Sequence, residues 1–341
     1  MVYIRADANA EIGTGHIMRC LALANAFRQK GVSTTFITAD HYSDGIIADN
    51  NYQHLCLNSI WNDLDQEIEI ILQLIQIRSI DLLIIDSYFV TAKYLDKIRQ
   101  KVKIIYFDDL NNFIYPVDIL INYNIYANKI IYEELYRKQN TELMISCKYA
   151  PLREEFQNSR VKIREAVSNI MITTGGSDIT NMISDLLKFV QDRNEFNNIT
   201  FHVVIGRFNQ YRMILEEMAE QDDKIKLHTN VTEMSKLMQM CDIAVTAGGS
   251  TLFELCACGL PSISFSCADN QLNSVKEFNQ RDIIYYAGDS RDNKEACINN
   301  IEQRLDCLIK NYELRLELSK RMSALVDGEG ANRIVYEILR I

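Results

Sequence analysis

A histidine directly after a glycine-rich turn is the first residue in the chain with clear chemical potential. Gly13 and Gly15 flank Thr14, and His16 follows at once. The two glycines let the backbone approach a ligand without a Cβ in the way. The apolar spacing after Gly15 predicts a helix, and the free N–H groups at a helix start suit an anion or a developing oxyanion. The same partial positive charge disfavours imidazolium, so we expect His16 to be an uncharged general base.

Two other interpretations of this turn remain open. The spacing of Gly13 and Gly15 begins a dinucleotide-binding fingerprint, but Met18 stands where its third glycine belongs. Asp40 does end the next predicted strand, as that fingerprint requires, yet an acid at a strand end is weak evidence alone. His16 is also a reasonable helix-capping residue without any chemistry.

Two glycine pairs in the second half of the chain have the same design. Gly175-Gly176 and Gly248-Gly249 each close an apolar strand and precede a helical pattern, so their amides are suited to a phosphate. Glu254 lies one turn into the second of these helices, where a carboxylate can accept hydrogen bonds from both hydroxyls of a ribose. Each pair alone is a weak signal. The combination of a GGS turn, a helical Glu and a following GLP favours a nucleotide diphosphate.

Apolar strands that alternate with amphipathic helices must position these residues. In the first half we expect strands at 2–4, 34–39, 79–89, 102–110 and 118–124, and helices at 62–78 and 91–101. This alternation predicts a parallel sheet covered on both faces, which binds ligands beyond the carboxyl ends of its strands. A single polar residue at such a position is more often a helix cap or loop residue than part of a site. Their shared edge nevertheless predicts that some of them serve a site: Asp7, Asp86, Tyr88, Asp108, Asp109, Asn122, Asn124 and Tyr126.

The alternation breaks around 145–165, where a proline and a charged stretch occur, and then starts again. Strands are expected at 168–178, 199–206, 224–231 and 243–247, and helices at 179–191, 234–242 and about 293–310, 313–325 and 330–340. Residues 247–266 are expected to form a glycine turn, a helix and a further strand, and IIYYAG a short strand after them. We therefore expect a Rossmann-like domain at 1–150, a linker at 151–165, a second Rossmann-like domain at 166–325 and a C-terminal helix at 326–341. That last helix could pack back on the first domain.

Composition excludes several functional classes. The chain has 341 residues, of which 48% are hydrophobic and 24% charged, and its net charge is −10. The acidic balance argues against a nucleic-acid-binding surface or a polybasic membrane anchor. No signal peptide precedes the first strand and no apolar run reaches membrane-spanning length, so we expect a cytoplasmic protein without membrane insertion. The nine cysteines are scattered, and we interpret them as small apolar residues in a reducing compartment rather than as a metal site.

The segment AGGSTLFELCACGLPSI at 247–263 resembles the nucleotide-binding signature of UDP-sugar enzymes with the glycosyltransferase-B (GT-B) fold, such as the transferase that makes lipid II. The resemblance implies two Rossmann-like domains whose parallel sheets face a central cleft. It also implies roles for individual residues. Glu254 would bind the ribose, the backbone near Val231 the uracil, and Asn270 and Gln271 the sugar, while the diphosphate would be held by Gly248, Gly249, Ser250 and Thr251.

Six further blocks narrow the family. IRADANAEIGTGHIMRCLALA, IIDSY, FDD, LINYNIYA, APLREEF and TTGGSDITN occur in this order. Together they are similar to the UDP-2,4-diacetamido-2,4,6-trideoxy-β-L-altropyranose hydrolase family of pseudaminic acid biosynthesis, which includes a spore-coat polysaccharide protein. The resemblance covers residues 2 to about 285 and implies that His16 is the catalytic base and that Tyr88 belongs to the site. Members can carry His where this chain has Ser87, which bears on sugar preference. The segment after about 285 would be a lid, a return helix or an oligomer surface.

The expected reaction is hydrolysis of the anomeric C–O bond of a UDP-sugar, with inversion and without metal or other cofactor. His16 would activate a water, and a nearby carboxylate such as Asp7 or Asp86 could orient His16. Such a step supplies nonulosonic acids for surface polysaccharide or flagellin glycosylation. One alternative is an inverting UDP-sugar glycosyltransferase, in which His16 activates an acceptor hydroxyl. Another is a member of the pathway that binds UDP without turnover. The stereochemistry of the sugar and the oligomeric state stay open.

Overall fold

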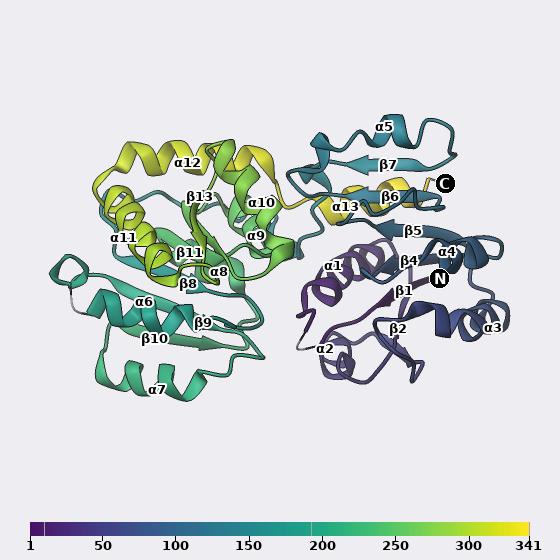
Figure 1. Cartoon of the computed structure of the whole chain (residues 1–341), viewed down its shortest axis with the longest axis horizontal. Coiled ribbons are helices and arrows are strands. Elements are labelled where there is room, and N and C mark those ends of the chain that lie inside the picture. Colours follow the sequence, from purple (N-terminus) through teal and green to yellow (C-terminus); the bar gives the residue numbers. More distant parts are fainter. Residues whose placement is uncertain (10, 192, 341) are drawn as a thin grey trace. The chain divides into compact units, whose positions relative to one another are not determined.

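The computed structural model describes residues 1–9, 11–191 and 193–340; Ala10, Asp192 and Ile341 lie outside the described residues. The chain divides into two compact units. The first unit comprises Met1–Glu154 together with Glu329–Ile341, and the second unit comprises Glu155–Gly328. Each unit contains one sheet in which every strand pair is parallel (Figure 1).

The sheet of the first unit has the strand order β3-β2-β1-β4-β5-β6-β7. Its strands are β1 (Val2–Ala6), β2 (Thr34–Thr38), β3 (Gln53–Cys56), β4 (Leu82–Asp86), β5 (Lys103–Phe107), β6 (Ile119–Asn122) and β7 (Glu142–Ile145). The strand order reverses between β1 and β4, where Ala6 is in register with Asp86. Ligands of open α/β sheets bind beyond the carboxyl ends of the strands at such a reversal. The first unit therefore has its most favourable ligand position beside Asp86.

Helices cover this sheet, and one of them comes from the far end of the sequence. They are α1 (Gly15–Gln29), α2 (Asp44–Asp49), η1 (Leu64–Glu67), α3 (Ile68–Arg78), α4 (Ala92–Arg99), η2 (Ala127–Lys129), α5 (Tyr132–Leu135), η3 (Cys147–Tyr149) and α13 (Gly330–Ile338), with η4 (Glu154–Phe156) at the division between the units. Helix α13 packs against α1 and η3. A Cβ on Gly330 would lie 2.0 Å from the carbonyl oxygen of Ala150, so only glycine allows this close approach.

The sheet of the second unit has the order β10-β9-β8-β11-β12-β13 and reverses between β8 and β11. Its strands are β8 (Asn169–Thr173), β9 (Thr200–Ile205), β10 (Ile225–Thr229), β11 (Ile243–Ala247), β12 (Ser262–Ser266) and β13 (Tyr285–Asp289). The helices are α6 (Met182–Gln191), η5 (Asn194–Phe196), α7 (Arg212–Gln221), α8 (Met234–Met240), α9 (Thr251–Cys258), α10 (Asp269–Gln280), α11 (Lys294–Lys310) and α12 (Tyr312–Leu325). Both glycine pairs follow the two strands at the reversal.

Each unit has its own apolar core between sheet and helices. In the first unit, Leu83 and Ile85 of β4 pack in one cluster with Ile71 and Ile75 of α3. In the second unit, the corresponding cluster joins β8 and β11 to apolar residues of α6 and α11. Two helix-covered parallel sheets confirm the predicted α/β class.

One helix begins later than its sequence suggests. Helix α6 starts at Met182 rather than at 179. The carboxylate of Asp178 accepts hydrogen bonds from the backbone N–H groups of Met182 (2.9 Å) and Ile183 (3.1 Å). Asp178 thus satisfies donors that would otherwise be free at this helix start. The Gly175-Gly176 turn is therefore separated from the first turn of α6.

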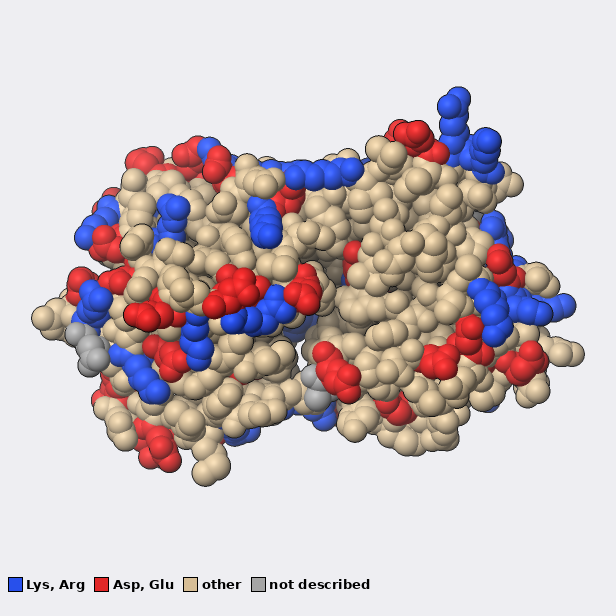
Figure 2. All heavy atoms as spheres, viewed as in Figure 1, with Lys and Arg blue, Asp and Glu red and all other residues tan. Residues whose placement is uncertain are grey.

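The described part of the chain contains no helix with the length and apolar character that a membrane crossing requires. Acidic and basic side chains are interspersed on the face drawn in Figure 2. All nine cysteines are free thiols, and Cys56 and Cys307 are the ones with appreciable exposure.

Candidate functional site

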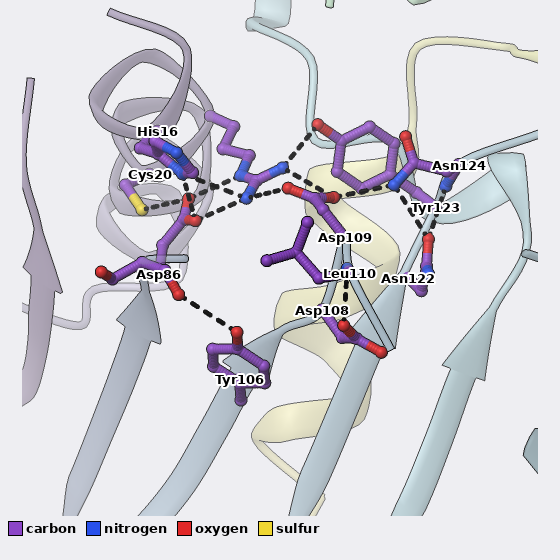
Figure 3. A network of polar contacts seen from close by, with 12 residues as sticks. His16, Cys20, Asp86, Tyr106, Asp108, Asp109, Leu110, Asn122, Tyr123 and Asn124 are labelled. Carbon is purple, nitrogen blue, oxygen red and sulfur yellow. Dashed lines mark hydrogen bonds and ion pairs between the residues drawn. The ribbon is translucent and has the colours of Figure 1, made fainter. Parts of the chain in front are cut away.

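His16 and Asp86 meet at the strand reversal of the first unit. Helix α1 begins one residue before His16, and β4 ends at Asp86. The Nδ1 atom of His16 lies 2.5 Å from Oδ1 of Asp86 (Figure 3). Asp86 is fully buried and His16 is 4% exposed. A buried carboxylate thus holds one ring nitrogen of the histidine and leaves the other free of this contact.

The electrostatics of Asp86 fix the direction of that hydrogen bond. Burial alone would raise the pKa of Asp86, but the Arg19 guanidinium and His16 together hold it well below its usual range. Asp86 is therefore ionised and can only accept hydrogen bonds. Arg19 Nη2 also lies 3.2 Å from Nδ1, but a guanidinium only donates. Nδ1 consequently carries the hydrogen that faces Asp86, and Nε2 is the nitrogen available to accept a proton.

Arg19 links Asp86 to a second carboxylate. Its Nε and Nη2 donate to the two oxygens of Asp86, each at 2.5 Å. Its Nη2 also donates to Asp109 Oδ2 at 2.8 Å, and its Nη1 to the hydroxyl of Tyr123 at 3.0 Å. Sequence reasoning missed Arg19. The available signal was its place three residues after His16, which puts both side chains on one face of the helix.

Several of the predicted strand-end residues join the same network. Asn124 donates from its side-chain nitrogen to Asp109 Oδ1 (2.7 Å) and to Asn122 Oδ1 (3.0 Å). The hydroxyl of Tyr126 donates to the backbone carbonyl of Asp109 at 2.8 Å. The ring of Tyr88 packs edge-on against His16, with the ring centroids 4.5 Å apart. The ends of β4, β5 and β6 are thus tied to α1 (Figure 3).

Asp108 and Asp7 have other partners. Asp108 accepts hydrogen bonds from the backbone N–H groups of Leu110 (2.9 Å) and Asn111 (2.7 Å) and thereby shapes its own loop. Asp7 accepts from Arg5 Nη1 at 2.5 Å and from the N–H of Ala39 at 2.7 Å. Of the two carboxylates considered for orienting His16, it is Asp86 that contacts Nδ1, while Asp7 is held by Arg5 and Ala39.

The glycine turn before α1 is closed by its own backbone. Asn9 and Gly13 exchange two backbone hydrogen bonds, of 2.9 Å and 3.3 Å. Gly13 has φ +72°, a conformation that L side chains rarely adopt. A Cβ at Gly13 or Gly15 would meet no atom within 4 Å. The space beside both glycines is therefore open to a ligand.

The turn after β11 in the second unit has one packed glycine and one open glycine. A Cβ on Gly248 would lie 2.3 Å from Val275 Cγ1 and 3.1 Å from Gln271 Cβ, so the backbone here is pressed against α10. A Cβ on Gly249 would meet nothing within 4 Å. Ser250 and Thr251 follow directly at the start of α9, so their N–H groups are among the donors that a helix leaves free. Glu254 lies in the first turn of this helix and is half-buried.

The turn after β8 is fixed by a glycine directly after β9, whose role sequence reasoning missed. A Cβ on Gly206 would lie 2.1 Å from the carbonyl oxygen of Gly175 and 2.5 Å from that of Gly176. The N–H of Phe208 donates to the same carbonyl of Gly176 at 2.9 Å. Beside them, the hydroxyl of Thr174 is buried and has no hydrogen-bond partner among the described residues. A buried hydroxyl of this kind requires an explanation, and a bound ligand supplies one.

The remaining predicted residues of the second unit lie on separate elements. Asn270 is exposed in the first turn of α10. Gln271 follows it, and its side-chain oxygen accepts a hydrogen bond from the N–H of Cys267 at 2.9 Å. Val231 follows β10 and is half-buried. Among the residues that the structure describes, no three His, Cys, Asp or Glu side chains are grouped to hold a metal ion.

Comparison with known proteins agrees with this architecture. Residues 169–332 match the glycosyltransferase family 28 C-terminal domain. The spore coat polysaccharide biosynthesis protein SpsG of Bacillus subtilis is 26% identical, over 98% of this chain and 96% of its own. The UDP-2,4-diacetamido-2,4,6-trideoxy-β-L-altropyranose hydrolase of Campylobacter jejuni is 29% identical, over 74% of this chain and 86% of its own.

Among solved structures, MurG of Acinetobacter baumannii aligns with a TM-score of 0.70 at 11% identity, over 100% of this chain and 99% of that one. At this level of identity the likeness concerns the fold. The chain is thus a homologue of SpsG and of the Campylobacter hydrolase, has a GT-B glycosyltransferase-like fold, and carries a family 28 C-terminal domain at residues 169–332.

Proposed function

We propose that this chain is a cytoplasmic UDP-sugar hydrolase that cleaves the anomeric C–O bond of a UDP-linked diacetamido-trideoxy sugar and releases UDP and the free sugar with inversion. The observation that carries the proposal is the His16–Asp86 pair, in which an ionised carboxylate holds Nδ1 and leaves Nε2 to accept a proton. The homology to a protein named for this hydrolysis supports the choice of substrate.

His16 acts as the general base in this scheme. Its Nε2 takes a proton from a water molecule that attacks the anomeric carbon opposite the departing diphosphate. Asp86 stabilises the imidazolium that forms, in the way that the carboxylate of a catalytic triad does. General base catalysis of this kind contributes about 10²–10⁴-fold to the rate. Tyr88 borders the histidine and is assigned, with Asp7, Gly13, Gly15 and Asn124, to the sugar.

The second unit binds the nucleotide in this proposal. In the turn after β11, the amides of Gly248, Ser250 and Thr251 face the diphosphate and stabilise the charge that develops on it, while the N–H of Gly249 donates to the carbonyl of Ala247. The turn at Gly175 and Gly176 lies beside them and contributes the amide of Gly176, since the N–H of Gly175 donates to the hydroxyl of Thr173. Glu254 accepts hydrogen bonds from the ribose hydroxyls, and the backbone at Val231 binds the uracil. Asn270 and Gln271 contact the sugar.

An inverting glycosyltransferase is the second candidate, because residues 169–332 match a glycosyltransferase domain. In that reaction the same Nε2 takes the proton of an acceptor hydroxyl instead of water. Both reactions use the same UDP-sugar site. They differ only in whether water or an acceptor hydroxyl attacks the anomeric carbon.

Proton NMR of the protein with a panel of UDP-sugars tests both proposals. A hydrolase releases UDP from a UDP-diacetamido-trideoxy sugar without any acceptor, and the first anomer detected is the inverted one. Release that requires an added acceptor favours the transferase, and absence of turnover under both conditions contradicts both.

Replacement of His16 identifies the base. His16→Gln should lower kcat by at least about 100-fold and leave UDP affinity nearly unchanged. His41→Gln is the matched control, because His41 belongs to the same unit and its side chain is 67% exposed. A His16→Gln protein that keeps more than about a tenth of the wild-type rate contradicts the role of His16.

A further inference from the structure

We propose that Arg19 is a positioning residue that keeps His16 available as a base, because it fixes the orientation of Asp86 and offsets part of the negative charge of Asp86 and Asp109. The proposal rests on the proposed function of His16 for its kinetic consequence. Its structural consequence, the protonation state of the His16 ring, does not depend on which reaction the protein catalyses.

The geometry leaves Asp86 one orientation. Arg19 donates to both carboxylate oxygens of Asp86 in a two-pronged contact. Asp86 Oδ1 then accepts from Arg19 and from His16 at the same time. The guanidinium of Arg19 also lies over two aromatic rings that meet edge to face, with Cζ 4.9 Å from the centroid of Phe107 and 5.5 Å from that of Tyr123. The planar fork thus sets the position of the oxygen that His16 contacts.

Arg19 offsets one of the two negative charges that lie around His16. The groups that face the ring are Asp86 and Arg19 at hydrogen-bond distance and Tyr88 edge-on. Cys20 of α1 approaches the other oxygen of Asp86 at 3.5 Å, and burial raises the pKa of its thiol, which stays uncharged. Asp109 adds a second carboxylate through Arg19. Loss of Arg19 would leave two carboxylates near the imidazole.

Two unbalanced carboxylates would favour the imidazolium form, which cannot act as a base. Loss of Asp109 would favour the neutral form of His16, because the positive charge of Arg19 would then be opposed by one carboxylate instead of two. The proposal therefore predicts shifts of opposite sign for the two replacements. A purely structural role for Arg19 predicts a loss of rate that is the same at every pH.

The pH dependence of kcat tests these signs. For Arg19→Met we expect kcat at pH 7 to fall at least about tenfold with little change in KM, and the acid limb of the profile to move up by about one pH unit or more, so that raising the pH restores activity. For Asp109→Asn the acid limb should move down. Arg19→Lys should keep the wild-type position of the limb at a lower kcat, because it keeps the charge but not the fork.

Arg28→Met is the matched control, since Arg28 is an exposed arginine in the last turn of the same helix. Its profile should coincide with that of the wild type. The proposal is overturned if Arg19→Met lowers kcat at every pH without moving the acid limb of the pH profile. It is also overturned by a displacement of Asp109→Asn in the same direction as that of Arg19→Met, and this second variant keeps the test valid if Arg19→Met does not fold.

Nitrogen-15 NMR of the His16 ring provides a test without turnover. The His16 signals are identified by their loss in His16→Gln. At a pH at which the wild-type ring is neutral, we expect its proton on Nδ1, and we expect Arg19→Met to show an imidazolium at that same pH. An unchanged ring spectrum in Arg19→Met contradicts the positioning role. If the protein hydrolyses no UDP-sugar but the ring spectra change as stated, the proposed function fails and the role of Arg19 stands.

Discussion

Gly206→Ala tests whether the turn after β8 belongs to the nucleotide site. The new Cβ would lie 2.1 Å from the carbonyl oxygen of Gly175, whereas ordinary contact begins at 3.4 Å. The turn must therefore move by about 1.3 Å, the difference between these two distances. Because the obstacle is backbone rather than a flexible side chain, no rotamer change can relieve it. The hydrogen bond from Phe208 to Gly176 lies in the same contact and would be strained with it.

The expected losses follow from this displacement. Misplacement by about 1 Å can cost about 100-fold where geometry is critical, and overpacking costs about 1–3 kcal/mol of stability. We therefore expect the Kd for UDP to rise by about 10- to 100-fold and the free energy of unfolding to fall by about 1–3 kcal/mol. Isothermal titration calorimetry with UDP measures the first quantity and urea unfolding the second.

Gly249→Ala is the control for stability, because its Cβ would meet no atom within 4 Å. Its free energy of unfolding should equal that of the wild type. If Gly206→Ala lowers stability but binds UDP as tightly as the wild type, the Gly175-Gly176 turn has no part in nucleotide binding. If it changes neither quantity, the close contact drawn from the structure is wrong.

Two further replacements and one pH dependence test the proposed roles of Asp86 and Glu254. Asp86→Asn should lower kcat by about 10⁴-fold without loss of UDP affinity, because a neutral amide cannot stabilise the imidazolium and its NH₂ group would face a donor of Arg19, which disturbs the orientation of His16; a kcat within tenfold of wild type would contradict this. Glu254→Gln should bind UDP at least about tenfold more weakly and no longer prefer UDP to its 2′-deoxy analogue, as measured by calorimetry; retained preference would exclude the ribose role. The depressed pKa of Asp86 stabilises the fold above the ordinary carboxyl range and loses this effect as the pH falls below about 4, so the difference in urea midpoint between wild type and Asp86→Asn should shrink between pH 6 and pH 3.

The sequence was sufficient for the elements with strong periodicity. Fully apolar strands such as β4 and β11 were predicted because neither face is open to water, and their helices because of apolar spacing. Helix α9 ends before Gly259, which has φ +66° and belongs to the GLP segment noted in the sequence. The fold class followed from this alternation alone.

Short polar elements were not predicted. The edge strands β3 and β7 have only four residues each, and their burial is partial, so no apolar run marks them. Helices α7 and α10 were missed as well. Few buried positions identify them, with Leu215 and Met218 the buried residues of α7.

The sequence predicted candidate residues of the site, but it did not predict which of them contact one another. Strand-end position identified Asp86 and Asp7 as carboxylates near His16, and only the register of β1 with β4 and the place of Arg5 separate their roles. Arg19 escaped notice because a charged residue in a helix usually faces water. The close approach of Gly206 to Gly175 joins segments 31 positions apart and leaves no local signal.

The return of α13 to the first unit has a consequence for how the chain matures on the ribosome. Residues 155–328 form one uninterrupted stretch, so the second unit has all its parts as soon as that stretch leaves the exit tunnel. The first unit begins earlier but must wait for its last helix, because α1 packs against α13 and Gly330 seats on Ala150. Folding of the two units therefore finishes in the reverse of the order in which they are synthesised: the first unit emerges first and completes its core last. A nascent chain stalled before residue 329 would expose to chaperones the face of α1 that α13 covers.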